Sequence, residues 1–289
     1  MAIIGHEATI KDIKGLIESG RLGHGYIFYG PAMVGKRTLA LALGKFLEKG
    51  EFAPPVEGEV LQDLKMIDAA FMRVLDPDAS GETIGIDAVR EVKNFLWQRP
   101  NASPRRTLII DDADLLTTEA QNALLKITEE PPSSSLLILV TSDPDAILPT
   151  ILSRLPKLYF GTMPQAAIER WLVDAHGLAK TKAAPFTKRA LGKPGLAWRL
   201  AHDEEFRARL ELAEAFLKTA PAARKEFIKK LIEPDDFSLR AFLEALVTVL
   251  AWDEPSKTKA AFWHAALRLS ENAGKAALNP RLQLAALLR

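Results

Sequence analysis

The sequence predicts an α/β domain with a mostly parallel sheet, followed by a region that is entirely helical. Three observations predict this fold class. Short apolar runs alternate with helix-like segments over the first 160 residues, a glycine-rich loop follows the first run, and no convincing strand follows Gly161. Strands that are apolar throughout are typical of parallel sheets covered by helices on both faces.

The first elements are a helix, a strand, a loop and a second helix. Residues 6–18 carry apolar residues at helical spacing, and Gly20 follows as a stop signal. The run 26–29 predicts a strand, residues 30–38 form the glycine-rich loop, and residues 39 to about 49 predict a helix. This order of elements is the one that a phosphate-binding loop requires.

The same alternation continues to residue 160. A surface loop is expected at 51–59. Asp87 is a candidate N-cap for one helix, and Thr117 or Thr118 for the next. The further predicted strands are 69–75, 107–110, 136–140 and 158–160. Beyond them the chain shows helical segments separated by glycine and proline, including Pro185, and the clearest helix spans 237–252.

The stretch from Gly30 to Thr38 has the form of a phosphate-binding loop. Gly30 and Gly35 let the backbone amides face a phosphate, and Lys36 adds a positive charge at the same place. One position departs from the pattern. Arg37 stands where a Ser or Thr hydroxyl normally meets Mg²⁺, and Thr38 comes one residue late.

Two acids follow the apolar run 107–110. Asp111 is placed to hold Mg²⁺ through water, and Asp112 is the candidate for orienting an attacking water. Taken alone, two aspartates after a strand are more often a turn or a helix cap. The phosphate-binding loop that precedes these aspartates favours the metal-site interpretation.

Arg154 lies between an apolar segment and the last predicted strand. On spacing alone, a surface arginine or a salt-bridge partner is the better interpretation. The functional alternative is an arginine finger, which reaches a γ-phosphate held by another subunit.

Composition limits the remaining possibilities. The 289 residues suffice for two or three domains, and no apolar run approaches the ~20 residues of a membrane span. We expect a cytoplasmic protein without membrane partners, because no signal-peptide pattern is present. With no cysteine and five scattered histidines, no zinc site is expected. The net charge is +1, but residues 161–200 carry seven Lys and Arg against two Asp and Glu. This basic segment is either a solvated face or a phosphate-facing patch.

Several longer motifs resemble bacterial DNA polymerase III clamp-loader subunits of the AAA+ class. The order and spacing of these motifs match along 1–160, so they are more specific than the loop alone. The motifs are Ile4 to Glu7, Ile109 to Asp114, Ala120 to Lys126, Glu129 to Pro132, Thr141 to Pro144 and Leu148 to Arg154. Within the family the chain is most similar to the delta-prime branch. Four features carry this similarity: the Gly-Lys-Arg end of the loop, the Asp-Asp-Ala-Asp element, Gly192 to Gly195 and Asn279 to Leu282.

The resemblance implies three domains and a set of partners. They are an AAA+ P-loop domain with a parallel sheet at 1–160, an all-helical lid at 161–202 and an all-helical collar at 203–289 through which five subunits form a ring. The implied partners are the gamma/tau motor subunits, the delta subunit, the sliding clamp, and primer-template DNA contacted through the assembled complex. The implied ATP or ADP site comprises Gly30, Gly35, Lys36, Arg37, Thr38, Asp111, Asp112 and Thr141.

Three departures from the motor subunits predict that the chain does not hydrolyse ATP by itself. Arg37 replaces the Mg²⁺-binding hydroxyl, Asp112 stands where motors have Glu, and Gly195 stands where their lid presents an arginine. Thr38 or Arg199 can compensate for a single change, but not for three together. The cysteine-bound zinc module of many relatives is also missing.

The chain keeps the arginine of this motif, Arg154. The resemblance implies that this arginine projects into the ATP site of a neighbouring motor subunit. Such an arginine accelerates hydrolysis roughly 10^3 to 10^5-fold. Phe95 and Leu96 lie on the helix that faces the clamp in relatives, although helical spacing also fits core residues. Arg105 and Arg106 are candidates for DNA contact. The rival interpretations are an ATP-hydrolysing motor subunit, a free-standing AAA+ enzyme acting on DNA or protein, and an interaction scaffold that makes no use of Arg154.

Overall fold

The chain divides into two compact units, which are described separately. The first runs through Ala197 and the second begins at Trp198. The computed structural model describes residues 3–68, 71–72, 83–234, 237–252, 257–273 and 279–287. The division into three domains at 160 and 202 stays a prediction.

A five-stranded parallel sheet organises the first unit, as the sequence predicts. Its strand order is β2-β3-β4-β1-β5, and every neighbouring pair is parallel. The strands are β1 (Gly25–Tyr29), β2 (Leu64–Ile67), β3 (Arg106–Ile110), β4 (Ser135–Thr141) and β5 (Lys157–Tyr159).

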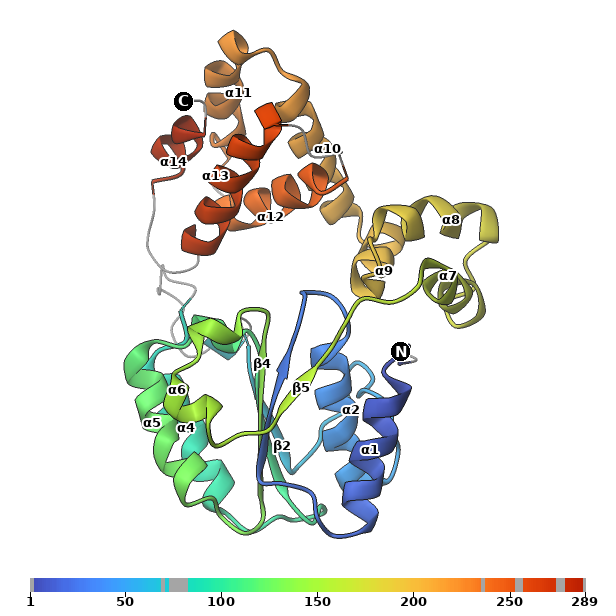
Figure 1. Cartoon of the computed structure of the whole chain (residues 1–289), viewed down its shortest axis with the longest axis vertical. Helices are drawn as coiled ribbons and strands as arrows, with labels where there is room; N and C mark the ends of the chain where they lie inside the picture. The colour runs from blue at the N-terminus through green and yellow to red at the C-terminus, as the bar shows by residue number, and fades with distance from the viewer. Residues whose placement is uncertain are drawn as a thin grey trace. The chain divides into compact units, whose positions relative to one another are not determined.

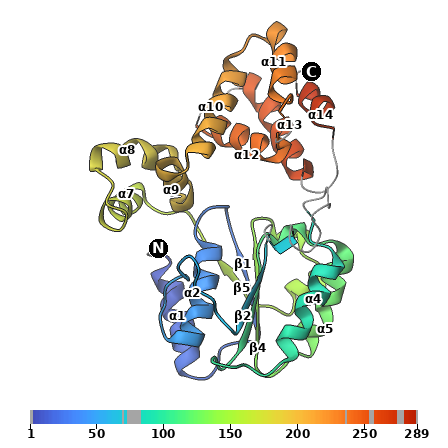
Figure 2. The same ribbon diagram turned by 180° about the vertical axis from the view of Figure 1, so that it is seen from behind.

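Helices cover both faces of the sheet. Figures 1 and 2 show α1 (Glu7–Glu18) and α2 (Lys36–Lys49) on one face. The other face carries α4 (Ile86–Trp97), α5 (Thr118–Glu129) and α6 (Pro149–Leu152). Two short 3-10 turns follow β3 and β4, at η1 (Ala113–Leu115) and η2 (Pro144–Ala146).

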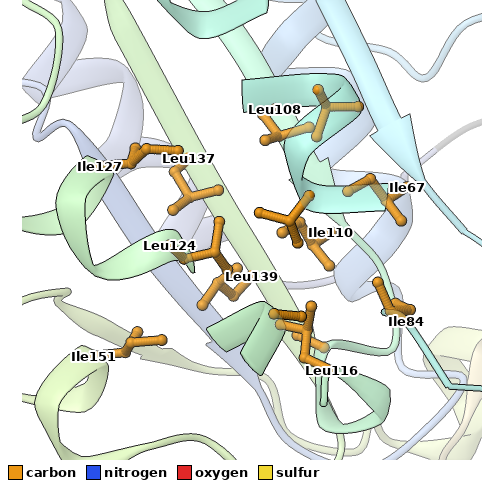
Figure 3. Packing of buried hydrophobic residues seen from close by; sticks show 14 of the residues in the cluster. Ile67, Ile84, Leu108, Ile110, Leu116, Leu124, Ile127, Leu137, Leu139 and Ile151 are labelled. Atoms are coloured by element: carbon orange, nitrogen blue, oxygen red, sulfur yellow. The ribbon is translucent and has the colours of Figure 1, made fainter. Parts of the chain in front are cut away.

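The strands bury side chains on both faces because successive residues point to opposite sides. In β3, Ile109 packs in the core under α1 and α2, while Leu108 and Ile110 pack in the core under α4 and α5. Figure 3 shows the second core, where Leu124 of α5 meets Leu139 of β4. Both sides of the sheet are therefore dry, which explains the uninterrupted apolar runs.

The prediction of a strand at 69–75 was wrong. The strand lies earlier, at Leu64–Ile67, and Phe71 and Met72 are helical. The other residues of 69–75 lie outside the described part of the chain. β2 is an edge strand with a half-exposed pattern that includes Lys65, and a charged side chain is tolerated at a sheet edge. A pattern of fully apolar runs therefore does not reveal this strand.

The helices that flank β3 differ in detail from their prediction. The N-cap of α4 is Gly85, whereas Asp87 lies in the first turn, where a carboxylate favours the helix dipole. Thr117 caps α5 by accepting a backbone N–H, as predicted. Phe95 and Leu96 are 5% and 0% exposed, so they belong to the core and cannot meet a clamp from this fold.

Arg105 and Arg106 are structural residues and not free cations for DNA. Arg105 donates to the carbonyl oxygens of Leu22 and Gly23, both at 2.7 Å. Arg106 is only 6% exposed and donates to the carbonyl oxygen of Gln62 at 3.0 Å. Their guanidinium groups satisfy backbone carbonyls at the start of the sheet.

The described residues after 161 contain helices and no strand. The segment after the sheet forms α7 (Gln165–Asp174), α8 (Lys180–Arg189) and α9 (Pro194–His202). Pro185 lies inside α8 and does not interrupt it, contrary to expectation. The second unit continues with α10 (Glu204–Lys218), η3 (Pro221–Ala223), α11 (Arg224–Leu231), α12 (Leu239–Leu250), α13 (Lys257–Ala273) and α14 (Pro280–Ala286). Of the helices described, none is both long and apolar enough to cross a membrane.

Candidate functional site

The loop between β1 and α2 has a backbone that only glycine permits at two points. Gly30 has φ of 138°, and a Cβ atom there would clash with the carbonyl oxygen of Phe160. Gly35 has φ of 106° and is the N-cap of α2. Both values lie in a region that side chains disfavour. The turn therefore brings the first amides of α2 to the mouth of the loop, where an anion binds favourably.

Lys36 lies at the first position of α2 and is 6% exposed. Its Nζ donates to the carbonyl oxygens of Gly30 at 2.6 Å and Pro31 at 2.7 Å. Burial lowers its pKa from 10.5 to about 8, against the opposing effect of three nearby carboxylates. Those carboxylates belong to Asp111, Asp112 and Asp114. The ammonium group is thus desolvated and held over the loop's own carbonyls.

The low pKa of Lys36 predicts a pH-dependent phosphate affinity. A phosphate at the loop favours the charged lysine and raises its pKa, so the free site loses its proton near pH 8 before the occupied site does. The affinity for ADP should therefore be maximal below about pH 8 and fall above it, by at most about tenfold per pH unit. Titration calorimetry between about pH 7 and about pH 9 measures this. Lys36→Arg should give a flat profile, and a flat wild-type profile would contradict the prediction.

Arg37 bridges two carboxylates at the ends of adjacent strands. Its Nη2 lies 2.9 Å from Oδ2 of Asp68, after β2, and its Nη1 lies 3.1 Å from Oδ2 of Asp111, after β3. Burial raises the pKa of Asp111, and the Arg37 charge opposes that rise. Asp68 is absent from the sequence-predicted site, because the prediction places the strand before it too late in the chain. Thr38 is the next residue of α2 and is partly exposed.

The remaining acids and Thr141 form the other half of the site. Asp112 has φ of 50° and turns the chain into η1, so it has a structural role in addition to any chemical one. Thr141 ends β4 and is 1% exposed, and its Oγ1 donates to Oδ1 of Asp114 at 2.8 Å. Asp114, which the site prediction omitted, therefore links the end of β4 to the carboxylates near Lys36.

Gly195, where the resemblance implies an arginine in motor subunits, has no room for a larger side chain. The amide of Gly195 donates to the carbonyl oxygen of Met33, in the loop, at 2.9 Å. A Cβ atom at Gly195 would lie 2.9 Å from that same oxygen. Arg199 does not replace the missing side chain, because it pairs with Asp203 at 3.3 Å and with Glu244 at 3.0 Å. Both pairs lie within the second unit.

Arg154 follows α6, and Figure 1 shows α6 on the face of the sheet opposite α2. Its Nη1 donates to the carbonyl oxygen of Thr150 at 2.6 Å, and its Nη2 lies 2.9 Å from Oε1 of Glu129. The side chain is 36% exposed. The structure thus groups Lys36 and Arg37 with the three acids after β3 and with Thr141, and it holds Arg154 at a different surface.

Comparison with known sequences links the first unit to replication proteins. Residues 5–164 match the family described as DNA polymerase III, delta subunit. The gamma/tau subunit of DNA polymerase III from Mycobacterium tuberculosis is 33% identical over 165 residues, which cover 56% of this chain and 28% of that protein. The delta' subunit from Escherichia coli is 32% identical over 148 residues, which cover 51% and 44%. The chain spans less than half the length of either relative.

Solved structures share the fold at lower identity. A gamma subunit-related protein of DNA polymerase III from Thermotoga maritima aligns with a TM-score of 0.62 and 23% identity, over 96% of this chain and 97% of that one. A single-residue variant of RuvB from the same organism aligns with a TM-score of 0.51 and 16% identity, over 98% and 88%. The AAA+-like α/β unit followed by helices is therefore the architecture that the sequence predicts.

Proposed function

Because the chain belongs to the DNA polymerase III, delta subunit family, we propose that it is a delta-prime-type subunit of the clamp loader. In this role it joins gamma/tau motor subunits and a delta subunit through its helical second unit. It helps to place the sliding clamp on primer-template DNA, which it meets as part of the assembly. It also supplies Arg154 to the ATP site of a neighbouring motor.

The ion pairs of Arg37 carry the proposal that this subunit is not itself a motor. The guanidinium group occupies the space between Asp68 and Asp111, at the loop position where a Ser or Thr hydroxyl normally meets Mg²⁺. The close approach of Gly195 to Met33 supports the same conclusion, because it leaves no place for a lid arginine. An ATPase applies the positive charges of Mg²⁺ and of a lid arginine to the γ-phosphate. In this chain Arg37 stands in place of the first, and the second is absent.

The rival function is an ATP-hydrolysing motor subunit of the same clamp loader. Lys36 and the carboxylate of Asp111 favour it, and gamma/tau and delta' relatives match at similar identity. Arg37 and Gly195 argue against it. A free-standing AAA+ enzyme is less well supported, since the likeness to RuvB concerns the fold alone.

ATP turnover by the purified chain separates these functions. We expect turnover at least about 10^2-fold slower than that of a motor subunit, because the metal and water-orienting groups are altered. The Lys36→Ala variant provides the background rate. Robust turnover that disappears in Lys36→Ala would establish the motor function instead.

A further inference from the structure

Arg37 places a fixed positive charge where the fold family places a metal ion. The carboxylates of Asp68 and Asp111 end two adjacent parallel strands, which brings them together beside the first turn of α2. Each is mostly buried, with side-chain exposures of 13% and 12%, and each accepts one N–H of the same guanidinium group. The fork of Arg37 therefore pairs with both acids at once, and its single positive charge offsets one of their two negative charges.

The residues present do not fit a Mg²⁺ ion at this place. Mg²⁺ requires oxygen ligands in an octahedral arrangement, whereas the position after Lys36 offers a guanidinium group with donors only. Among the described residues no group of three or more His, Cys, Asp and Glu side chains is arranged to hold a metal ion. The phosphate loop, in contrast, keeps its glycine conformations and its buried lysine.

We propose that the guanidinium group of Arg37 acts as a permanent cation in place of Mg²⁺. The phosphate-binding loop then binds a nucleoside polyphosphate that carries no metal ion. The site then carries two fixed cations, Lys36 at the loop and Arg37 beside it. A third, Lys193, lies close enough for its charge to lower the pKa of Lys36. The inference rests on the proposed function in treating the loop as a nucleotide site, but it does not depend on assembly with other subunits.

Two measurements on the isolated chain test the proposal. The first is the affinity for ADP, determined by calorimetry in EDTA and again in millimolar Mg²⁺ at matched ionic strength. The wild-type affinity should change by less than about threefold, whereas Arg37→Ser, which restores the usual hydroxyl, should bind at least about tenfold more tightly with Mg²⁺. Arg90→Ala removes an exposed arginine of α4 and should behave as the wild type does.

The second measurement needs no nucleotide. Removing the guanidinium group in Arg37→Ala leaves two partly buried carboxylates facing each other, so Mg²⁺ should raise the melting temperature of this variant but not that of the wild type.

Three outcomes would overturn the proposal. They are ADP binding by the wild type that requires Mg²⁺, no ADP binding in either buffer, and a melting temperature of the wild type that rises with Mg²⁺ as much as that of Arg37→Ala. Failure to assemble with motor subunits would refute the clamp-loader function and leave these results unaffected.

Discussion

Under the proposed function, replacing Arg154 with alanine is expected to slow ATP hydrolysis at the neighbouring motor site by roughly 10^3-fold. A guanidinium group that reaches the γ-phosphate of a neighbour stabilises charge that develops in the transition state. Among the residues that the structure describes, Arg154 forms its ion pair with Glu129, and both side chains are substantially exposed. Such a pair contributes less than about 1 kcal/mol, while a 10^3-fold rate effect corresponds to about 4 kcal/mol. Losing the ion pair with Glu129 therefore costs less than the arginine can contribute to the transition state.

The test uses an assembly in which only the motor site next to this chain can bind ATP. DNA-stimulated phosphate release is compared for the wild type, Arg154→Ala and Arg154→Lys, and lysine should restore little because it lacks the planar fork. Glu129→Gln, which frees the arginine from its ion pair, should retain turnover. Arg90→Ala is the matched control for loss of an exposed arginine. Unchanged turnover in an intact Arg154→Ala assembly would leave only a scaffold role.

The phosphate loop and the central strands could be predicted from the sequence because their signals are local. Gly30, Gly35 and Lys36 stand between an apolar run and a helical pattern, and the structure places them as that pattern requires. β2 could not be found in this way. It lies at the edge of the sheet, where Lys65 is tolerated, so its apolar signal is weak. For the same reason the sequence does not indicate Asp68, the second partner of Arg37.

Sequence patterns could not predict which groups the arginine side chains contact. Arg106 and Arg199 look alike as charges in a sequence, yet Arg106 is buried against backbone carbonyls and Arg199 lies over the ring of Phe206, with its guanidinium carbon 3.7 Å from the ring centre. Which carboxylate or carbonyl an arginine meets depends on contacts between distant segments. The Arg37 bridge spans 74 residues to Asp111, and no local period reveals such a pair.

Asp63 is expected to be one of the most sensitive positions for stability, although it lies far from any proposed chemistry. Its side chain is 1% exposed and precedes β2. The carboxylate accepts backbone N–H groups from Asn101 at 2.9 Å, Ala102 at 2.6 Å and Ser103 at 2.7 Å. Nε of Arg106, also buried, lies 3.4 Å away. These contacts fix the segment that leads into β3.

Asp63→Ala should lower the free energy of unfolding by about 3 to 5 kcal/mol, because it leaves buried N–H groups without their acceptor and the buried guanidinium group of Arg106 without its counter-charge. Urea unfolding measures this loss, and faster amide hydrogen exchange at residues 101–103 locates it. Asp87→Ala removes an exposed carboxylate from the first turn of α4 and should cost less than about 1 kcal/mol. Equal losses for the two variants would contradict the assigned role of Asp63.

The carboxylate of Asp63 also makes the free energy of unfolding depend on pH. Burial alone would raise the pKa of Asp63, but the three backbone N–H groups and Arg106 outweigh it and hold the pKa below the usual value of 3.8. A carboxyl whose pKa is lower in the folded state stabilises the fold above its unfolded pKa, and this contribution is lost as the pH falls through the folded value. The difference in unfolding free energy between the wild type and Asp63→Ala should therefore be constant near neutrality and shrink below about pH 4. A difference that stays unchanged in acid would mean that the charge of Asp63 does not hold the entrance to β3, and hence does not help to position Asp111 at the far end of that strand.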